Sequence, residues 1–295
     1  MDTNPTRNAH EPAVQAFWQN PPWQQAGGYR LGISPLSLDL WCPRQIELGE
    51  RQRKQELLRT ESQTVCAAEP DSLAAQQQVM TWLSSKHSLP QLDSAVDAAS
   101  TAASVVPLVR CALGVPEDFC IITRAGSEYR LSAACVCAPS YWHLPSKMGL
   151  LLSQVHAPVA GLNEKIGPRI NEFMQRLPHQ RLFGRRNWFI HASHELFQPN
   201  ADAEHNQATH DIDGDHLRSM VVRSETQTLR RIDDDNILFT ILVNCYPLRQ
   251  LEDYPSAAQA MQESIASFNA DEYEEFGLNQ LGTALNDYLA TIVQI

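Results

Sequence analysis

The sequence of 295 residues has no long apolar run and no excess of basic residues. A membrane helix needs roughly 18 to 20 consecutive apolar residues, and the longest candidate, the segment 148–159, is interrupted. The net charge of -11 argues against a nucleic-acid-binding protein, which would carry a basic stripe. The start, MDTNPTRNAHEP, lacks the basic residues and apolar stretch of a secretory signal. We therefore expect a soluble, cytoplasmic protein with no membrane or nucleic-acid partner.

Motifs of several enzyme classes are also missing. There is no GxSxG elbow, no P-loop and no GxGxxG after a strand, which argues against nucleophilic hydrolysis, NTP cleavage and dinucleotide binding. Residues 191–195, HASHE, match neither common zinc signature, and residues 211–215, DIDGD, fail as a calcium loop because its twelfth position is Val222. The seven cysteines lack the spacing of zinc or iron–sulfur sites, so we interpret most of them as small buried hydrophobes.

What is present is the composition of an ordinary globular protein, with 43% hydrophobic and 19% charged residues. Residues 1–35 carry Pro-Pro, Gln-Gln and Gly-Gly pairs and little periodicity, which predicts an irregular N-terminal arm that Trp18 and Trp23 could dock. Residues 36–295 are predicted to form a single domain.

Strand and helix patterns in this domain come in separate blocks. Two hairpins are predicted, over 118–138 and 220–246, and 187–191 is a candidate further strand. Amphipathic periodicity predicts helices over 44–60, 72–86, 166–177, 256–268 and 278–293, while 93–106 is helical or loose and 199–217 is an exposed loop. An antiparallel sheet flanked by N- and C-terminal helices is an α+β architecture.

The second hairpin carries an unusual set of polar residues on one strand. Because alternate residues of a strand share a face, five side chains project the same way: Arg223, Glu225, Gln227, Leu229 and Arg231. If this face is buried, each polar group needs a partner, and an anionic ligand is one such partner. A solvent-facing strand with mixed charges is the alternative.

His156 is the candidate metal ligand. It follows the apolar run Met148–Val155, which looks buried, and precedes a turn made rigid by Pro158. An imidazole held there could present a nitrogen to a haem iron. A core histidine bonded to a backbone carbonyl is the competing interpretation.

An ordered series of short blocks resembles the haem-dependent oxidative N-demethylase alpha-subunit family from about Leu36 to the C-terminus. The blocks are Glu117-Asp118 before a strand, 139–142 (PSYW), 147–149 (KMG), 155–159 (VHAPV), 186–188 (RNW) and 223–231 (RSETQTLRR). Each block alone is weakly specific, whereas their order in combination is fairly specific.

This resemblance implies a single PAS-like domain that binds haem b. Members of the family oxidise a methyl group of a secondary amine such as dimethylamine and release formaldehyde. The resemblance therefore implies a haem-dependent monooxygenase with a small amine substrate, which takes electrons from NAD(P)H through a separate reductase protein. No flavin or iron–sulfur motif is visible that would supply those electrons within the chain.

The resemblance also assigns roles to residues. It makes His156 the axial iron ligand and places Arg223, Gln227 and Arg231 at the haem propionates or the pocket wall. Glu225 and Gln227 are the candidate catalytic residues, with Glu225 near the substrate or paired with an arginine. The remaining cofactor-binding assignments are Lys147, Asn187, Trp188 and Thr228.

Two positions depart from the family pattern. Thr226 stands where the family has a second arginine, and the turn after Arg231 reads Ile-Asp-Asp-Asp-Asn instead of a Leu-Pro turn. Two other functions stay open: a haem-binding sensor or carrier, because PAS-like folds commonly bind ligands to signal, and a partner subunit that has lost its haem, which the Thr226 departure allows.

Overall fold

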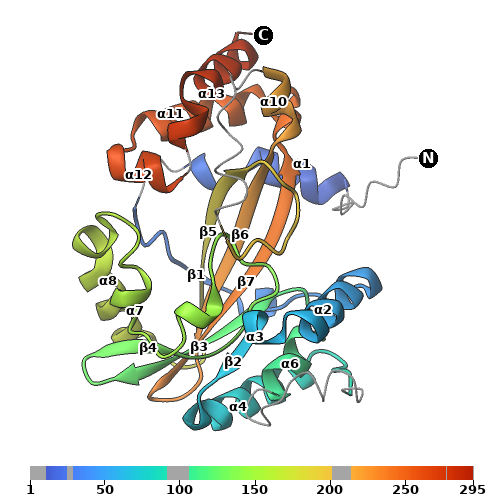
Figure 1. Cartoon of the computed structure of the whole chain (residues 1–295), viewed down its shortest axis with the longest axis vertical. Coiled ribbons are helices and arrows are strands. Elements are labelled where there is room, and N and C mark those ends of the chain that lie inside the picture. Colours follow the sequence, from blue (N-terminus) through green and yellow to red (C-terminus); the bar gives the residue numbers. More distant parts are fainter. Residues whose placement is uncertain (1–10, 25–28, 92–105, 201–213, 277, 295) are drawn as a thin grey trace.

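The fold is built on one antiparallel sheet. The computed structural model describes residues 11–24, 29–91, 106–200, 214–276 and 278–294 (Figure 1). Its seven strands lie in the order β1-β5-β6-β7-β3-β4-β2. Their bounds are β1 (Ser34–Leu36), β2 (Cys66–Ala68), β3 (Asp118–Ala125), β4 (Glu128–Cys135), β5 (Leu182–His191), β6 (Val221–Arg231) and β7 (Asn236–Pro247).

Both predicted hairpins are confirmed. Strands β3 and β4 turn through Gly126, whose φ of +67° suits glycine, and β6 pairs with β7 along its whole length. Strand β5 extends the second hairpin into a meander, and β7 pairs with β3 to join the two units. The long strands β5, β6 and β7 therefore form the centre of the sheet, and short edge strands complete it.

Helices surround this sheet in three groups, as Figure 1 shows. Near β3 and β4 lie α2 (Leu48–Thr60), α3 (Ser62–Val65), η3 (Pro70–Ser72), α4 (Leu73–Ser84) and α6 (Val106–Ala112), with η2 (Leu38–Leu40). At the far end of the long strands lie α1 (Glu11–Gln19), η1 (Pro22–Gln24), α10 (Gly214–Ser219), η5 (Leu248–Asp253), α11 (Pro255–Ala266), α12 (Ala270–Glu275) and α13 (Leu278–Val293). The third group is η4 (Leu144–Ser146), α7 (Leu152–Val155) and α8 (Leu162–Arg176).

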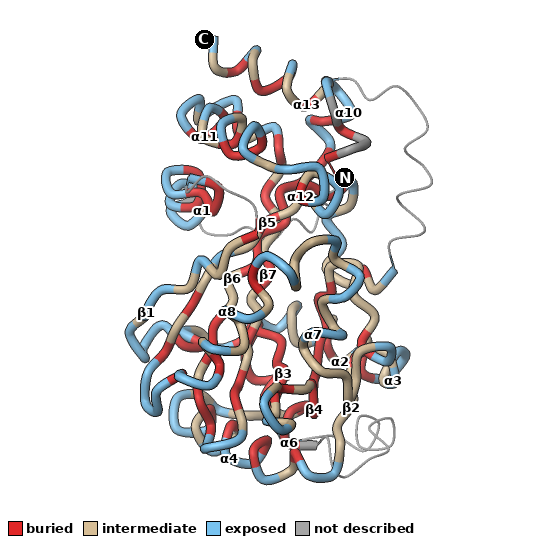
Figure 2. The backbone as a smooth tube through the Cα atoms, turned by 90° about the vertical axis from the view of Figure 1, so that its left-hand side faces the viewer, coloured by how far each residue is buried: buried red, intermediate tan, exposed pale blue. Residues whose placement is uncertain are grey.

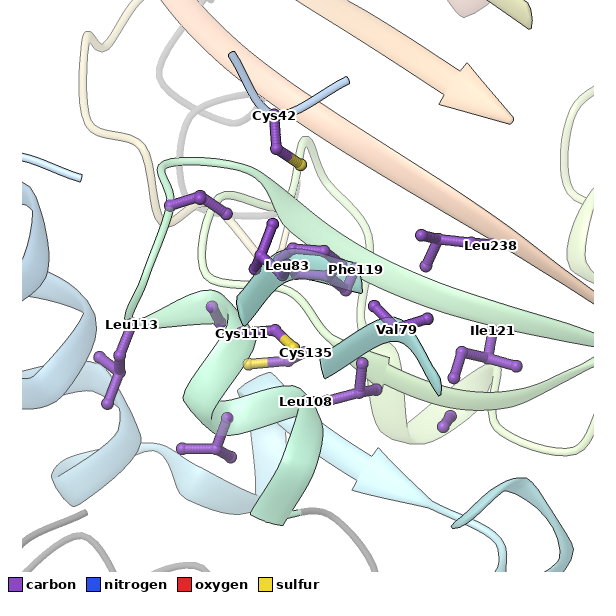
Figure 3. Packing of buried hydrophobic residues seen from close by; sticks show 14 of the residues in the cluster. Cys42, Val79, Leu83, Leu108, Cys111, Leu113, Phe119, Ile121, Cys135 and Leu238 are labelled. Atoms are coloured by element: carbon purple, nitrogen blue, oxygen red, sulfur yellow. The ribbon is translucent and has the colours of Figure 1, made fainter. Parts of the chain in front are cut away.

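Two of these groups pack on one side of the sheet, which we call the α4 face. It carries the side chains of β6 at Ser224, Thr226, Thr228 and Arg230. In β3 and β4, the side chains of Phe119, Ile121 and Cys135 pack against α4 and α6 (Figure 3). Above them, Trp188 and Val222 pack against α1, α11 and α13. Figure 2 shows that buried residues follow the strands and the inward sides of these helices.

The opposite side is the α8 face, on which β6 presents Arg223, Glu225, Gln227, Leu229 and Arg231. Leu229 packs with Met174 and Leu177 at the end of α8. The strand alternation predicted from the sequence is therefore confirmed. The solvent-facing alternative is wrong, because three of these polar side chains, Arg223, Glu225 and Arg231, are buried.

The α+β class and the predicted helices are confirmed, with ends that differ by a few residues. The predicted loop 199–217 is wrong at its end, where residues 214–219 form α10 and bury Leu217. The stretch 93–105 and most of the DIDGD sequence lie outside the described residues. Among the helices that are described, none is long and apolar enough to cross a membrane.

Residues 11–24 do not form the irregular arm predicted from their composition. They fold as α1 and η1 because their aromatic residues have partners from the C-terminal part of the chain. The ring of Phe17 stacks on Tyr246 with centroids 3.7 Å apart, and the Nε1 of Trp23 donates to the carbonyl of Ala257 at 2.9 Å. Trp18 and Trp23, which the sequence offers as possible docking residues, are each only 1% exposed.

We predict that Trp23→Ala lowers the free energy of unfolding by about 3–5 kcal/mol, because it leaves a cavity where a large aromatic side chain was buried. Gln15→Ala, on the exposed side of α1, serves as the control and should change stability by less than about 0.5 kcal/mol. Urea denaturation measures both values. Equal stability of the two variants would show that the N-terminal helix is not docked.

Candidate functional site

The α8 face carries a polar group of side chains at the centre of the long strands. Arg185 on β5 lies directly opposite Gln227 on β6, and Asn187 lies opposite Glu225. Directly opposed residues of an antiparallel pair project to the same side of the sheet. The register therefore brings a guanidinium, a carboxylate and two amides together.

Glu225 is held at both carboxylate oxygens. Ser140 Oγ donates to Oε1 at 2.7 Å, and Gln227 Nε2 donates to Oε2 at 2.7 Å. Ser140 in turn accepts from Arg223 Nε at 2.6 Å. This chain of hydrogen bonds fixes the carboxylate on the sheet.

Arg223 has no exposed surface, and its donors are engaged by the protein. Its terminal nitrogens donate to four backbone carbonyls: Ala138 at 2.8 Å, Pro139 at 3.1 Å, Glu195 at 3.1 Å and Leu196 at 3.0 Å. These acceptors lie on the segments that follow β4 and β5. Arg223 therefore fastens both segments to the sheet.

Arg231 has a similar environment at the other end of β6. Its Nε donates to Leu177 O at 2.5 Å and its Nη2 to Met174 O at 2.5 Å, while Nη1 reaches Asp234 O at 3.0 Å. Met174 lies in the last turn of α8, where carbonyls lack partners within the helix and the helix dipole favours a cation. Arg231 thus caps α8 and the β6–β7 turn.

His156 follows α7 immediately and is half-buried. Within the described part of the chain, its imidazole has no hydrogen-bond partner. Burial lowers the pKa of His156, and the cations Arg185 and Lys147 lower it further. At neutral pH the ring is therefore uncharged, which is the form that binds a metal. The apolar run before it is mostly half-buried rather than buried, because α7 is short and lies at the surface.

The two cations next to His156 are weakly engaged. Arg185 Nη1 donates to Arg30 O at 3.4 Å, and Lys147 Nζ donates to Val155 O at 3.4 Å. Among the described residues neither side chain has another hydrogen-bond acceptor. Burial lowers the pKa of Arg185, whereas the Glu225 carboxylate raises it. Two positive groups with unengaged donors are therefore available to an anion.

Two cavities adjoin this group. The one beside His156 measures about 350 Å³ and is also lined by Tyr129, Leu152 and Ile170. A larger one of about 560 Å³ lies along β5 beyond its pairing with β1. Arg185 and other β5 residues line the larger cavity, so it is open to both faces of the sheet.

The residues predicted from the sequence fall on both faces. His156, Lys147, Asn187, Glu225 and Gln227 belong to the α8 face or the segments that cover it. Two others lie on the α4 face. Trp188 packs against Trp23 with ring centroids 5.2 Å apart, and the Oγ1 of Thr228 is 2.5 Å from that of Thr240.

Arg185 is the site residue that the sequence prediction missed. The block that carries the family resemblance, 186–188, begins one residue later at Arg186, whose position opposite Thr226 puts it on the α4 face. Strand alternation around Asn187 was the available signal, since it places Arg185 and Asn187 on the same side.

The types of donor match those that hold a haem, and His156 and Arg185 line two separate cavities. Its iron needs a single axial side chain in the simplest case, and an uncharged imidazole without a partner meets that need. The propionates need cations, and Arg185 and Lys147 are next to that imidazole. No group of three or more metal-binding side chains occurs in the described residues, but a porphyrin does not require one.

Comparison with known proteins gives one family match. A family model described as "Haem-dependent oxidative N-demethylase, alpha subunit-like" matches residues 89–284, more than half of the chain. No curated protein matches the sequence.

The contacts of the arginines lead to a stability prediction. Arg231→Met should lower the free energy of unfolding by about 2–4 kcal/mol, because it leaves buried carbonyls without donors. Arg185→Met should cost less than about 1 kcal/mol, since few protein acceptors lose a partner. Arg176→Met removes an exposed i,i+4 ion pair on α8 and serves as the control. If Arg185→Met destabilised the chain as much as Arg231→Met, Arg185 would be a structural residue.

A second prediction concerns pH. The folded-state pKa of His156 is lowered, so its contribution to stability is complete above the unfolded value of about 6.5 and is lost as the pH falls through the folded value. In a proton NMR titration, the resonance absent from His156→Gln should titrate below pH 6.5. The wild type should also lose more stability than His156→Gln between pH 7 and pH 5. A midpoint above 6.5 would contradict this.

Proposed function

Because the chain belongs to the haem-dependent oxidative N-demethylase alpha-subunit-like family, we propose that it binds haem b through His156 and oxidises a small methylated amine. The observation that carries this proposal is the imidazole of His156, which has no hydrogen-bond partner among the described residues and whose pKa is lowered by burial and by the charges of Arg185 and Lys147. A haem presents one iron and two carboxylates, and this group offers one ligand and two cations.

The arginines of the strand motif have different roles in this proposal. Arg185 and Lys147 hold the propionates through charge-assisted hydrogen bonds. Arg223 and Arg231 hold the surrounding backbone, since their donors are engaged by carbonyls. This revises the expectation that Arg223 and Arg231 bind the propionates directly.

Glu225 and Gln227 orient the reactants. The Glu225 carboxylate, fixed by Ser140 and Gln227, keeps Arg185 charged and in place, and attracts a protonated amine. Asn187, next to Glu225 in the register, adds an amide to the same wall. When bound, the haem supplies the oxidation of the N-methyl carbon with dioxygen and external electrons, which releases formaldehyde.

Partners and fold type complete the proposal. Electrons come from NAD(P)H through a separate reductase subunit, in keeping with the alpha-subunit description of the family. The five central strands follow the order β5-β6-β7-β3-β4, in which the meander β5-β6-β7 and the hairpin β3-β4 are joined by the pairing of β7 with β3. We assign this arrangement to the PAS-like class.

One observation favours a second candidate, a partner subunit without haem. The most distinctive residues of the strand motif, Arg223 and Arg231, are satisfied by the protein itself. A protein without haem would therefore still need these two arginines for its fold. In this proposal, haem binding depends on His156, Arg185 and Lys147 instead.

A haem reconstitution experiment tests the proposed ligand. The full chain supplied with haem should show a Soret band, and His156→Ala should lose it or shift it. His179→Ala removes a half-exposed histidine next to Asp234 and should leave the spectrum unchanged. Wild-type protein that takes up no haem would favour the partner-subunit function.

A titration with haem tests the two cations. Arg185→Met and Lys147→Met should each weaken haem affinity by about 10- to 100-fold, the factor expected for one charge-assisted hydrogen bond. Formaldehyde release from dimethylamine, with a reductase and NADPH present, then separates an enzyme from a sensor. A haem protein without turnover on any methylated amine would be a sensor or carrier.

A further inference from the structure

Three cysteines lie together where the edge strand β2 meets β4. Cys66 is in β2 directly opposite Cys135 in β4, and Cys137 follows two residues later. The pKa of the Cys135 thiol is raised well above its usual value, and the thiols of Cys137 and Cys66 both affect it. All three are free thiols, and Cys66 alone is half-buried, while Cys135 and Cys137 are buried.

The register at Cys66 and Cys135 suits a disulfide. Val136 N donates to Val65 O at 2.7 Å, and Glu69 N donates to Ser132 O at 2.8 Å. Hydrogen-bonded and non-hydrogen-bonded pairs alternate along an antiparallel ladder, which makes Cys66 and Cys135 a non-hydrogen-bonded pair. Such pairs have Cα atoms about 4.5 Å apart, inside the range of roughly 4.4–6.8 Å found in disulfides.

The other neighbours of Cys135 are less suited to reaction. Figure 3 shows Cys111, from α6, beside Cys135. Cys111 is buried, whereas Cys66 is half-buried, so peroxide reaches the Cys66 thiol more readily. Cys137 is on the same chain segment as Cys135, and two residues of extended chain span about 6.6 Å, near the upper limit for a bridge.

We propose that Cys66 and Cys135 form a thiol-oxidation site that hydrogen peroxide converts to a disulfide. The Cys66 thiolate attacks one peroxide oxygen, the O–O bond breaks, and the products are a Cys66 sulfenic acid and, after protonation, water. The Cys135 sulfur then attacks the Cys66 sulfur and displaces a second water. Two thiols are oxidised by two electrons, and one peroxide is reduced to two waters.

The bridge links β2 covalently to the sheet next to the segment that carries Lys147. Ala67 of β2 packs with Leu144 and Met148, which flank Lys147. A cross-link between residues 66 and 135 closes a long loop, so the oxidised chain should unfold at a temperature higher by on the order of 10 °C. This inference does not depend on haem.

The test uses the full chain without haem, folded and reduced. After treatment with one equivalent of hydrogen peroxide, free thiols are alkylated and the protein is digested and analysed by mass spectrometry. The expected product is a peptide pair joined through Cys66 and Cys135, two hydrogens lighter than the sum of the reduced peptides. Cys245, which is also half-buried, should stay alkylated and serves as the internal control.

Cysteine-to-serine variants identify which two cysteines form the disulfide. Cys66→Ser and Cys135→Ser should each abolish it and the gain in unfolding temperature, whereas Cys111→Ser and Cys137→Ser should keep both. Peroxide-treated protein unfolded beforehand in urea should show no preference for this pair. A bridge from Cys135 to Cys111 or Cys137, a Cys66 dimer, or sulfinic acid at Cys66 without a bridge would each overturn the proposal.

Discussion

A guanidinium with no exposed surface determines how the rest of this site is arranged. Taking the Arg223 side chain out of water is unfavourable unless every donor finds an acceptor. The acceptors are Ser140 Oγ and carbonyls of two separate segments, 138–139 and 195–196. Those segments can satisfy Arg223 only when they lie across β6. The covering layer, and with it the Ser140 contact to Glu225, follows from that requirement.

On the α8 face of β6, the residues at the two ends support the fold. The residues between them form the polar group of the candidate site. Arg223 and Arg231 occupy the ends and bind backbone carbonyls. Between them, Glu225 and Gln227 bind each other and face Arg185 and Asn187 on β5. The rigid ends hold the middle of the strand in register, so the position of Arg185 beside His156 is a consequence of strand pairing rather than of loop conformation.

Local patterns in the sequence were sufficient to predict most strands and helices, because strand alternation and amphipathic periodicity depend only on residues close together in the chain. They also placed Glu225 and Gln227 on one face with Arg223. They could not predict a contact whose two residues are far apart in the sequence. The carbonyls that bind Arg223 are 27 to 85 residues away, and the partner that stacks on Phe17 is Tyr246. Composition alone therefore made a docked helix look like an irregular arm, and strand alternation alone could not identify the carbonyls that bind Arg223.

The pairing of β5 with β6 shows where the departure at position 226 lies in the structure. Thr226 lies opposite Arg186 of β5 and lines the cavity of about 560 Å³. Threonine therefore places a neutral side chain beside Arg186, where the family pattern has a second arginine. Arg186 keeps a cation in that cavity, on the neighbouring strand.

The side chain at position 226 also points to the α4 face, away from His156, Glu225 and Gln227. The second departure, the acidic turn, supplies its own partners, since Asp233 Oδ1 accepts from the backbone nitrogens of Asp235 and Asn236. Neither change alters the group around His156. The departure at position 226 therefore lies at the larger cavity, and the acidic turn lies at the end of β6, so neither is beside His156.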